Sequence, residues 1–129
     1  MDWPIIHSYT RAQAIDDGVL VDVTETAREA GFRIPVALTR AVWERYVEVP
    51  PRVECQDVPG RLWDVVWMTR RAILRAGGCS PTFFSGREVR IHLRVRNDNR
   101  RPRPVELKAI CGPGDAGEPV VTILLPEED

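Results

Sequence analysis

An arginine-rich segment late in the chain carries the side chains best suited to binding chemistry. Residues 87–108 hold eight basic groups and three acids, a net charge of +5, which leaves −6 for the rest of a chain of net charge −1. Arginine binds phosphates and carboxylates through paired hydrogen bonds. We therefore predict that this segment binds an acidic protein surface or a nucleic acid, and a solvated face with partly compensated charge is the competing interpretation. The predicted contact residues are Arg90, His92, Arg94, Arg96, Arg100, Arg101, Arg103 and Lys108.

The number of aromatic side chains near this segment helps to distinguish a protein partner from a nucleic acid. Few aromatic residues are interleaved with the arginines, although stacking on exposed rings is a large part of single-strand recognition. A protein partner is therefore favoured over nucleic acid. Trp3, beside Pro4 and two isoleucines, must either pack onto the domain or offer an apolar contact, and it joins the candidate contact residues.

Catalytic chemistry has little support in the sequence. His7 and His92 are the only histidines, and no titratable pair stands at a spacing that a reaction would require. Asp16 and Asp17 are adjacent carboxylates, which we interpret as solvated helix charge. We predict no catalytic residue, no cofactor and no metal, and a small enzyme without a recognisable motif remains an alternative.

A glycine-rich stretch, residues 112–117, matches the G-x-G-x-x-G pattern of dinucleotide-binding loops. That pattern binds pyrophosphate where a strand turns into a helix, whereas these glycines join two predicted strands. Asp115 would also repel phosphate. The stretch therefore predicts a hairpin.

Helices are predicted in the first 76 residues. Thr10 and Gln13 form a capping box, which predicts a short helix that ends near Gly18, and Thr24 should cap a second one over residues 25–30. Apolar residues at helical spacing predict a third helix from Pro35, with Leu38, Val42 and Trp43 on one face, and the longest helix over residues 61–76. We place Trp43, Trp63 and Trp67 in the core.

A two-residue apolar rhythm begins near position 87. Val89, Ile91, Leu93 and Val95 alternate with polar residues, residues 105–111 repeat the alternation, and residues 120–125 are nearly all apolar. The fold class we predict is α+β, with N-terminal helices packed on a C-terminal antiparallel meander of three strands, or of four if residues 19–23 add one. Residues 1–129 should form a single domain.

Composition predicts a globular chain inside the cell. Of the 129 residues, 43% are hydrophobic and 29% are charged, which is ordinary for a folded domain. Cys55, Cys79 and Cys111 lack any C-x-x-C pair, so we expect reduced thiols and a cytoplasmic protein. No stretch approaches the ~18 apolar residues of a membrane span, and the start lacks a signal peptide.

Several runs of sequence resemble one family. They are residues 6–15, 17–23, 61–65, 95–99 and 111–115. Together they resemble a family of small bacterial proteins of unknown function that is typical of phages, plasmids and integrative elements. The resemblance extends over nearly the whole chain and implies an accessory protein of a mobile element. It brings no catalytic residues to this sequence.

The function predicted is therefore a non-enzymatic accessory protein that binds a host or element-encoded protein, such as a component of a defence system that it inhibits. A DNA- or RNA-binding accessory protein that uses residues 87–108 is the alternative. A meander also has two edges, and an uncovered edge can pair with its copy to form a homodimer.

Overall fold

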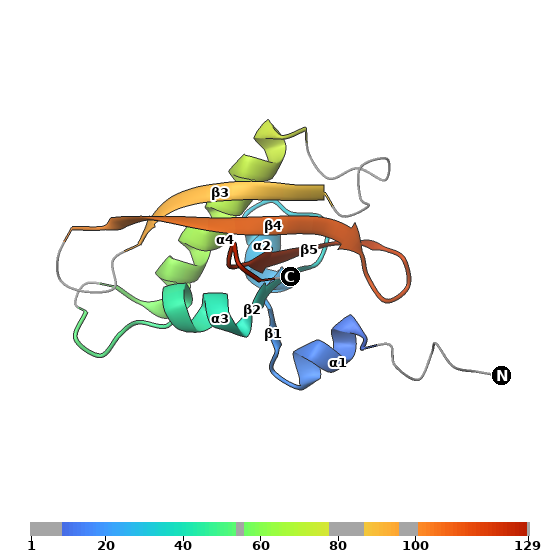
Figure 1. The fold of residues 1–129 in the computed structure, drawn as a ribbon, viewed down its shortest axis with the longest axis horizontal. Helices are drawn as coiled ribbons and strands as arrows, with labels where there is room; N and C mark the ends of the chain where they lie inside the picture. Colours follow the sequence, from blue (N-terminus) through green and yellow to red (C-terminus); the bar gives the residue numbers. More distant parts are fainter. Residues whose placement is uncertain (1–8, 54–55, 78–86, 96–100, 129) are drawn as a thin grey trace.

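A five-stranded sheet organises the chain (Figure 1). The structure, a computed structural model, describes residues 9–53, 56–77, 87–95 and 101–128. The elements follow in the order α1 (Arg11–Asp16), β1 (Leu20–Asp22), α2 (Thr24–Glu29), β2 (Val36–Thr39), α3 (Arg40–Val42), the π-helix η2 (Trp43–Val47), α4 (Val58–Arg75), β3 (Arg87–Val95), β4 (Arg103–Pro113) and β5 (Pro119–Leu124).

The sheet is mixed, with the strand order β1-β2-β5-β4-β3. The pairs β3–β4, β4–β5 and β1–β2 are antiparallel, whereas β2 and β5 are parallel. The α+β class and the antiparallel order of the last three strands are confirmed. A wholly antiparallel sheet preceded by all of the helices is wrong, because β1 and β2 lie among the helices.

The strand β2 replaces the first turn of a predicted helix. Its four residues are all buried, because β2 lies between β1 and β5 near the middle of the sheet. A strand covered on both faces does not alternate polar and apolar residues, so it lacks the two-residue rhythm. The helical segment begins only at Arg40, where the Thr39 side chain accepts a hydrogen bond from the Val42 amide.

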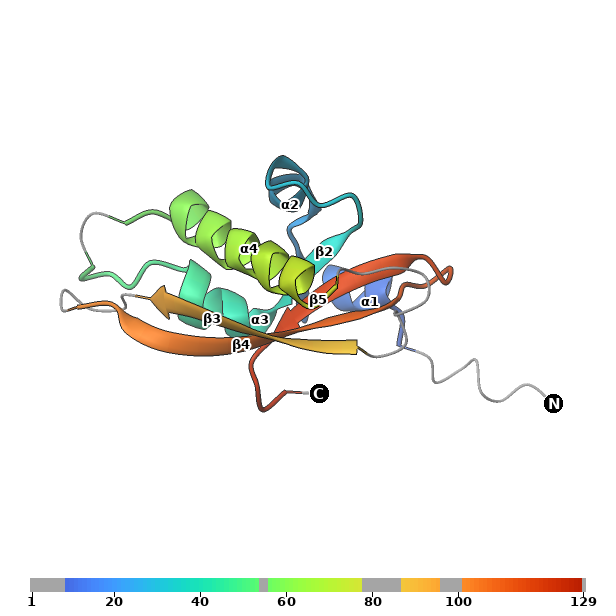
Figure 2. The same cartoon turned by 90° about the horizontal axis from the view of Figure 1, so that it is seen from above.

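The two faces of β3 differ. Val89, Ile91 and Leu93 are at most 7% exposed and belong to a core that also contains Val65 and Val66 of α4. Figure 2 shows α4 and α2 on the same side of the sheet. The polar residues of β3 alternate with these apolar ones and therefore point to the opposite face.

A glycine-rich hairpin, as predicted, joins β4 to β5. The Gly114 amide donates to the Glu118 carbonyl at 2.6 Å, and Gly117 has a φ of +82°, a value that favours glycine. Asp115 projects from this hairpin to the start of α1, where its carboxylate accepts hydrogen bonds from the amides of Arg11 (2.7 Å) and Ala12 (3.0 Å). The predicted capping box of Thr10 and Gln13 is also present. The hairpin therefore holds α1 in place.

This contact predicts a pH-dependent stability. The amides of Ala12 and Arg11 hold the pKa of Asp115 below its ordinary value. A carboxyl with a depressed pKa stabilises the fold above its unfolded pKa, which is about 3.9, and this contribution is lost as the pH falls through the folded pKa. Asp115→Asn should therefore lower the thermal midpoint at pH 7, and the gap to the wild type should narrow toward pH 3.

Thermal unfolding followed by circular dichroism at several pH values measures that gap. Asp16→Asn, at an exposed position within α1, is the control and should change the midpoint little. A gap that stays constant between pH 7 and pH 3 would contradict the role given to Asp115.

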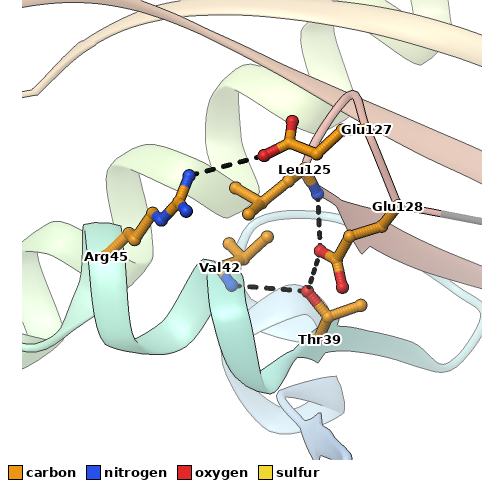
Figure 3. Close-up of polar contacts among 6 residues, drawn as sticks. All are labelled: Thr39, Val42, Arg45, Leu125, Glu127 and Glu128. Carbon is orange, nitrogen blue, oxygen red and sulfur yellow. Dashed lines mark hydrogen bonds and ion pairs between the residues drawn. The ribbon is translucent and has the colours of Figure 1, made fainter.

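The chain after β5 folds back onto the end of β2 (Figure 3). Glu128 Oε1 accepts hydrogen bonds from the Thr39 hydroxyl (2.7 Å) and from the Leu125 amide (2.9 Å). Glu127 lies 3.5 Å from the Arg45 guanidinium. Thr39 therefore links the start of α3 to the segment that follows β5.

One cysteine departs from the expectation of reduced thiols. Cys111 is 1% exposed and is disulfide-bonded, so the expectation is wrong at this position. Whether two cysteines meet depends on the distance between their Cα atoms in the fold, which sequence spacing does not reveal. Cys55 and Cys79 lie outside the described residues.

Candidate binding cleft

Two adjoining cavities, of about 420 and 530 Å³, lie between α4 and the second half of β3. Both are lined by Asp64 of α4 and by Leu93 and Arg94 of β3, and we call them together the α4–β3 cleft. The first cavity is also lined by Tyr46, Gln56, Asp57, Arg61, Val65 and Val95, and the second by Trp67, Met68, His92 and Pro104. Cavities of this size hold small molecules or a few side chains of a partner.

The helix α4 brings aromatic side chains to this cleft. Its buried residues include Leu62, Val65 and Val66, so the neighbouring Trp63 and Trp67 lie off the packed face. The two indole rings are four residues apart on the helix and stack, with centroids 5.8 Å apart and an angle of 13° between the planes. Each tryptophan is 37% exposed, so their assignment to the core is wrong.

Two residues of opposite charge line the cleft: Asp64 of α4, and Arg94 of β3, whose side chain alternates with the core residue Leu93 and so points toward the opposite face of the sheet. Asp64 and Arg94 are both exposed, and within the described part of the chain neither makes an ion pair or a side-chain hydrogen bond. Their capacity for hydrogen bonding is therefore available to a partner. The guanidinium of an arginine can donate two parallel hydrogen bonds to a carboxylate of a partner.

Arg61 holds one wall of the first cavity. It is 7% exposed, and its guanidinium donates to the carbonyls of Tyr46 (3.0 Å) and Arg45 (3.4 Å) and to Gln56 Oε1 (2.6 Å). Burial lowers its pKa from the ordinary arginine value. Arg61 therefore joins the end of η2 to the first turn of α4, and sequence analysis had assigned it only to a helix start.

The predicted arginine row divides into cleft residues and compensated residues. His92 and Arg94 line the cleft. Arg90 lies 3.0 Å from Glu88 and 3.5 Å from Glu106, so much of its charge is balanced. Lys108 lies opposite Arg90 in the register, but it is buried and its Nζ is 3.7 Å from Glu88, so it does not serve as a surface cation.

The remaining predicted contact residues lie at the start of β4 or beyond the described residues. Arg101, just before β4, and Arg103, its first residue, are both exposed. Trp3, Arg96 and Arg100 lie outside the described residues.

Sequence analysis missed Trp67, Asp64 and Met68 as cleft residues, and it missed the exposure of Trp63. The available signal was the width of the apolar surface of α4, where Leu62, Val66 and Ile73 form one line and Trp63, Trp67 and Leu74 form another. A helix packed on one side of a sheet buries one of two such lines.

The described residues around the cleft offer few side chains for catalysis or metal binding. His92 Nε2 lies 3.9 Å from Glu106 on the solvated face of the sheet, and the His92 side chain is 74% exposed. Among the described residues, no cluster of three His, Cys, Asp or Glu side chains could hold a metal ion.

Fold and cleft together define an α+β protein with a tryptophan-lined cleft beside an outer strand of its sheet. The chain belongs to the Family of unknown function (DUF6573), which matches residues 2–76, more than half of its length. The match includes Trp63 and Trp67 but ends before β3, so the wider resemblance noted in the sequence is supported only for this part. Comparisons with curated proteins and with solved structures give no match.

Within the described ranges, none of the helices combines the length and the apolar character that crossing a bilayer requires.

Proposed function

We propose that this chain is a non-enzymatic accessory protein of a mobile genetic element and that it binds a host or element-encoded protein at the α4–β3 cleft. The observation that carries the proposal is the stacked pair of Trp63 and Trp67, both partly exposed, of which Trp67 lines the cleft. The mobile-element context rests on the sequence resemblance alone. A defence-system protein of the host is the partner that this context favours.

The composition of the cleft supports a protein partner. Tryptophan, methionine and arginine are enriched at the centres of protein interfaces, and tryptophan and arginine dominate their binding energy. Trp67 and Met68 supply apolar surface, while Asp64 supplies a polar group that fixes orientation. A partner that covers the indoles would remove apolar surface from water, which favours association.

The test begins with affinity purification of the tagged protein from its native host, followed by measurement of the dissociation constant for the captured protein. Trp67→Ala should weaken binding about 30-fold or more, since residues that dominate an interface contribute ~2 kcal/mol or more. Arg33→Glu, an exposed arginine in the loop before β2, is the control and should leave the affinity within about twofold. A folded Trp67→Ala variant with wild-type affinity would refute this binding site.

Single-stranded nucleic acid is the second candidate, because stacked and partly exposed tryptophans supply surfaces for base stacking. A titration with oligothymidylate, followed by tryptophan fluorescence at low and moderate salt, separates the two candidates. Quenching that weakens steeply as salt rises would favour nucleic acid. Unchanged fluorescence would count against it.

A further inference from the structure

The outer edge of β3 is a long pairing surface. β3 spans nine residues and is the last strand of the sheet, and within the described residues it pairs only with β4. The opposite edge is the three-residue strand β1, and α1 contacts it. The free amides and carbonyls of an outer strand can accept another strand.

The sequence of β3 is complementary to itself in the register that pairs all nine residues. If two copies pair antiparallel about Ile91, all nine residues pair, Glu88 lies opposite Arg94 of the partner subunit, and Val89 lies opposite Leu93 of the partner subunit. Directly opposed residues share a face, so the two Glu88–Arg94 pairs would form on the solvated face and the Val89–Leu93 pairs on the core face.

Neighbouring registers are disfavoured by charge. Pairing about His92 sets Arg90 opposite Arg94 twice, and pairing about Arg90 sets Arg90 opposite itself. Like charges directly opposite one another destabilise a sheet. Charged side chains normally protect an outer strand from pairing, whereas here the position of Glu88 favours the register centred on Ile91 over these two neighbours.

At the free edge of β3, the face of the sheet that carries α4 also offers surface to a second copy. Figure 1 shows that α4 crosses β3 and extends past its free edge. The cleft lies beside residues 92–95, on one side of the pairing centre. The β3 strand of a second copy would run along the open side of this cleft. The two clefts would then lie at opposite ends of the paired strands.

We propose that a second copy of this chain pairs with β3 in the register centred on Ile91 and joins two five-stranded sheets into one. The inference goes beyond the proposed function, because the partner there is a different protein. Charge complementarity within β3 selects the occupant: Arg94, which has no ion-pair partner within the described part of its own chain, gains Glu88 of the partner subunit.

Sedimentation equilibrium or size-exclusion chromatography with light scattering tests the pairing. The wild type should show twice the 14.6 kDa mass of the chain at micromolar concentration. Arg94→Glu should raise the dimer dissociation constant about 30-fold, because two attractive cross-strand pairs become repulsive. Arg33→Glu should leave the dimer intact.

A mixing experiment separates pairing from misfolding. Glu88→Arg should also raise the dimer dissociation constant, although it loses contacts with Arg90 and Lys108 inside the chain. Equal amounts of Glu88→Arg and Arg94→Glu should form a heterodimer, because both cross-strand pairs are then attractive again. A monomeric wild type across the concentration range, variants that dimerise as well as the wild type, or variants that stay apart when mixed would each overturn the proposal. None of these results depends on the binding of a different partner protein.

Discussion

Ala37→Pro should leave little or no folded protein. Ala37 is fully buried in β2 and lies opposite Asp22 of β1 on one side and Thr122 of β5 on the other. Proline lacks the amide that a strand between two neighbours needs, and it is found essentially only in outer strands or at bulges. If residues 36–39 formed the first turn of a helix, as their sequence suggests, proline would cost little there.

Urea unfolding followed by circular dichroism and intrinsic fluorescence measures this effect. Glu25→Pro is the matched control, because Glu25 is the second residue of α2 and Pro59 already occupies the second position of α4. The control should keep a cooperative transition, whereas Ala37→Pro should lose it. A wild-type midpoint for Ala37→Pro would contradict the position of β2 inside the sheet.

Arg61→Ala should destabilise the protein by about 2–4 kcal/mol, because hydrogen bonds from a charged group contribute ~1.5–3 kcal/mol and the freed carbonyls stay poorly solvated. The variant removes the donors to Tyr46 and Arg45 at the end of η2 and to Gln56 before α4. Arg61→Lys keeps the charge but not the planar fork, so it should recover only part of the loss.

The free energy of unfolding, from urea titration, measures both variants. Arg71→Ala, at an exposed position on the same helix, should change it by no more than about 0.5 kcal/mol. If Arg61→Ala were as mild as this control, or if Arg61→Lys matched the wild type, Arg61 would not be the link between η2 and α4.

Local signals in the sequence predicted the parts of the fold that local chemistry determines. The capping box of Thr10 and Gln13 is present as expected, because both partners lie within one turn. The alternation of Val89, Ile91 and Leu93 with polar residues identified β3, since its two faces meet different surroundings. The hairpin reading of the glycine-rich loop was correct for the same local reason.

Long-range pairing accounts for what the sequence did not reveal about the sheet. Val36, Ala37 and Leu38 are consecutive apolar residues, and Leu38 also lies at helical spacing from Val42. Their conformation is determined by pairing with β5, more than eighty residues later in the chain. A short apolar run cannot be assigned to strand or helix by periodicity alone.

The cleft was only partly predictable. Strand alternation predicted the exposure of Arg94 and His92, but the exposure of Trp63 and Trp67 depends on which apolar line of α4 packs against the sheet. Lys108 was assigned to the correct face, yet its burial and its proximity to Glu88 depend on the neighbouring strand β3. The register of the strands decides which side chains become neighbours, and the register cannot be read from the sequence.

Site-specific photocrosslinking in native cells tests the central claim, that a partner protein contacts the α4–β3 cleft. A benzophenone amino acid in place of Met68, which lines the cleft, should give a light-dependent adduct with one partner protein. The same probe in place of Arg33, which is exposed in the loop before β2, should give none. Absence of an adduct at position 68, or the same adducts from both positions, would contradict the claim.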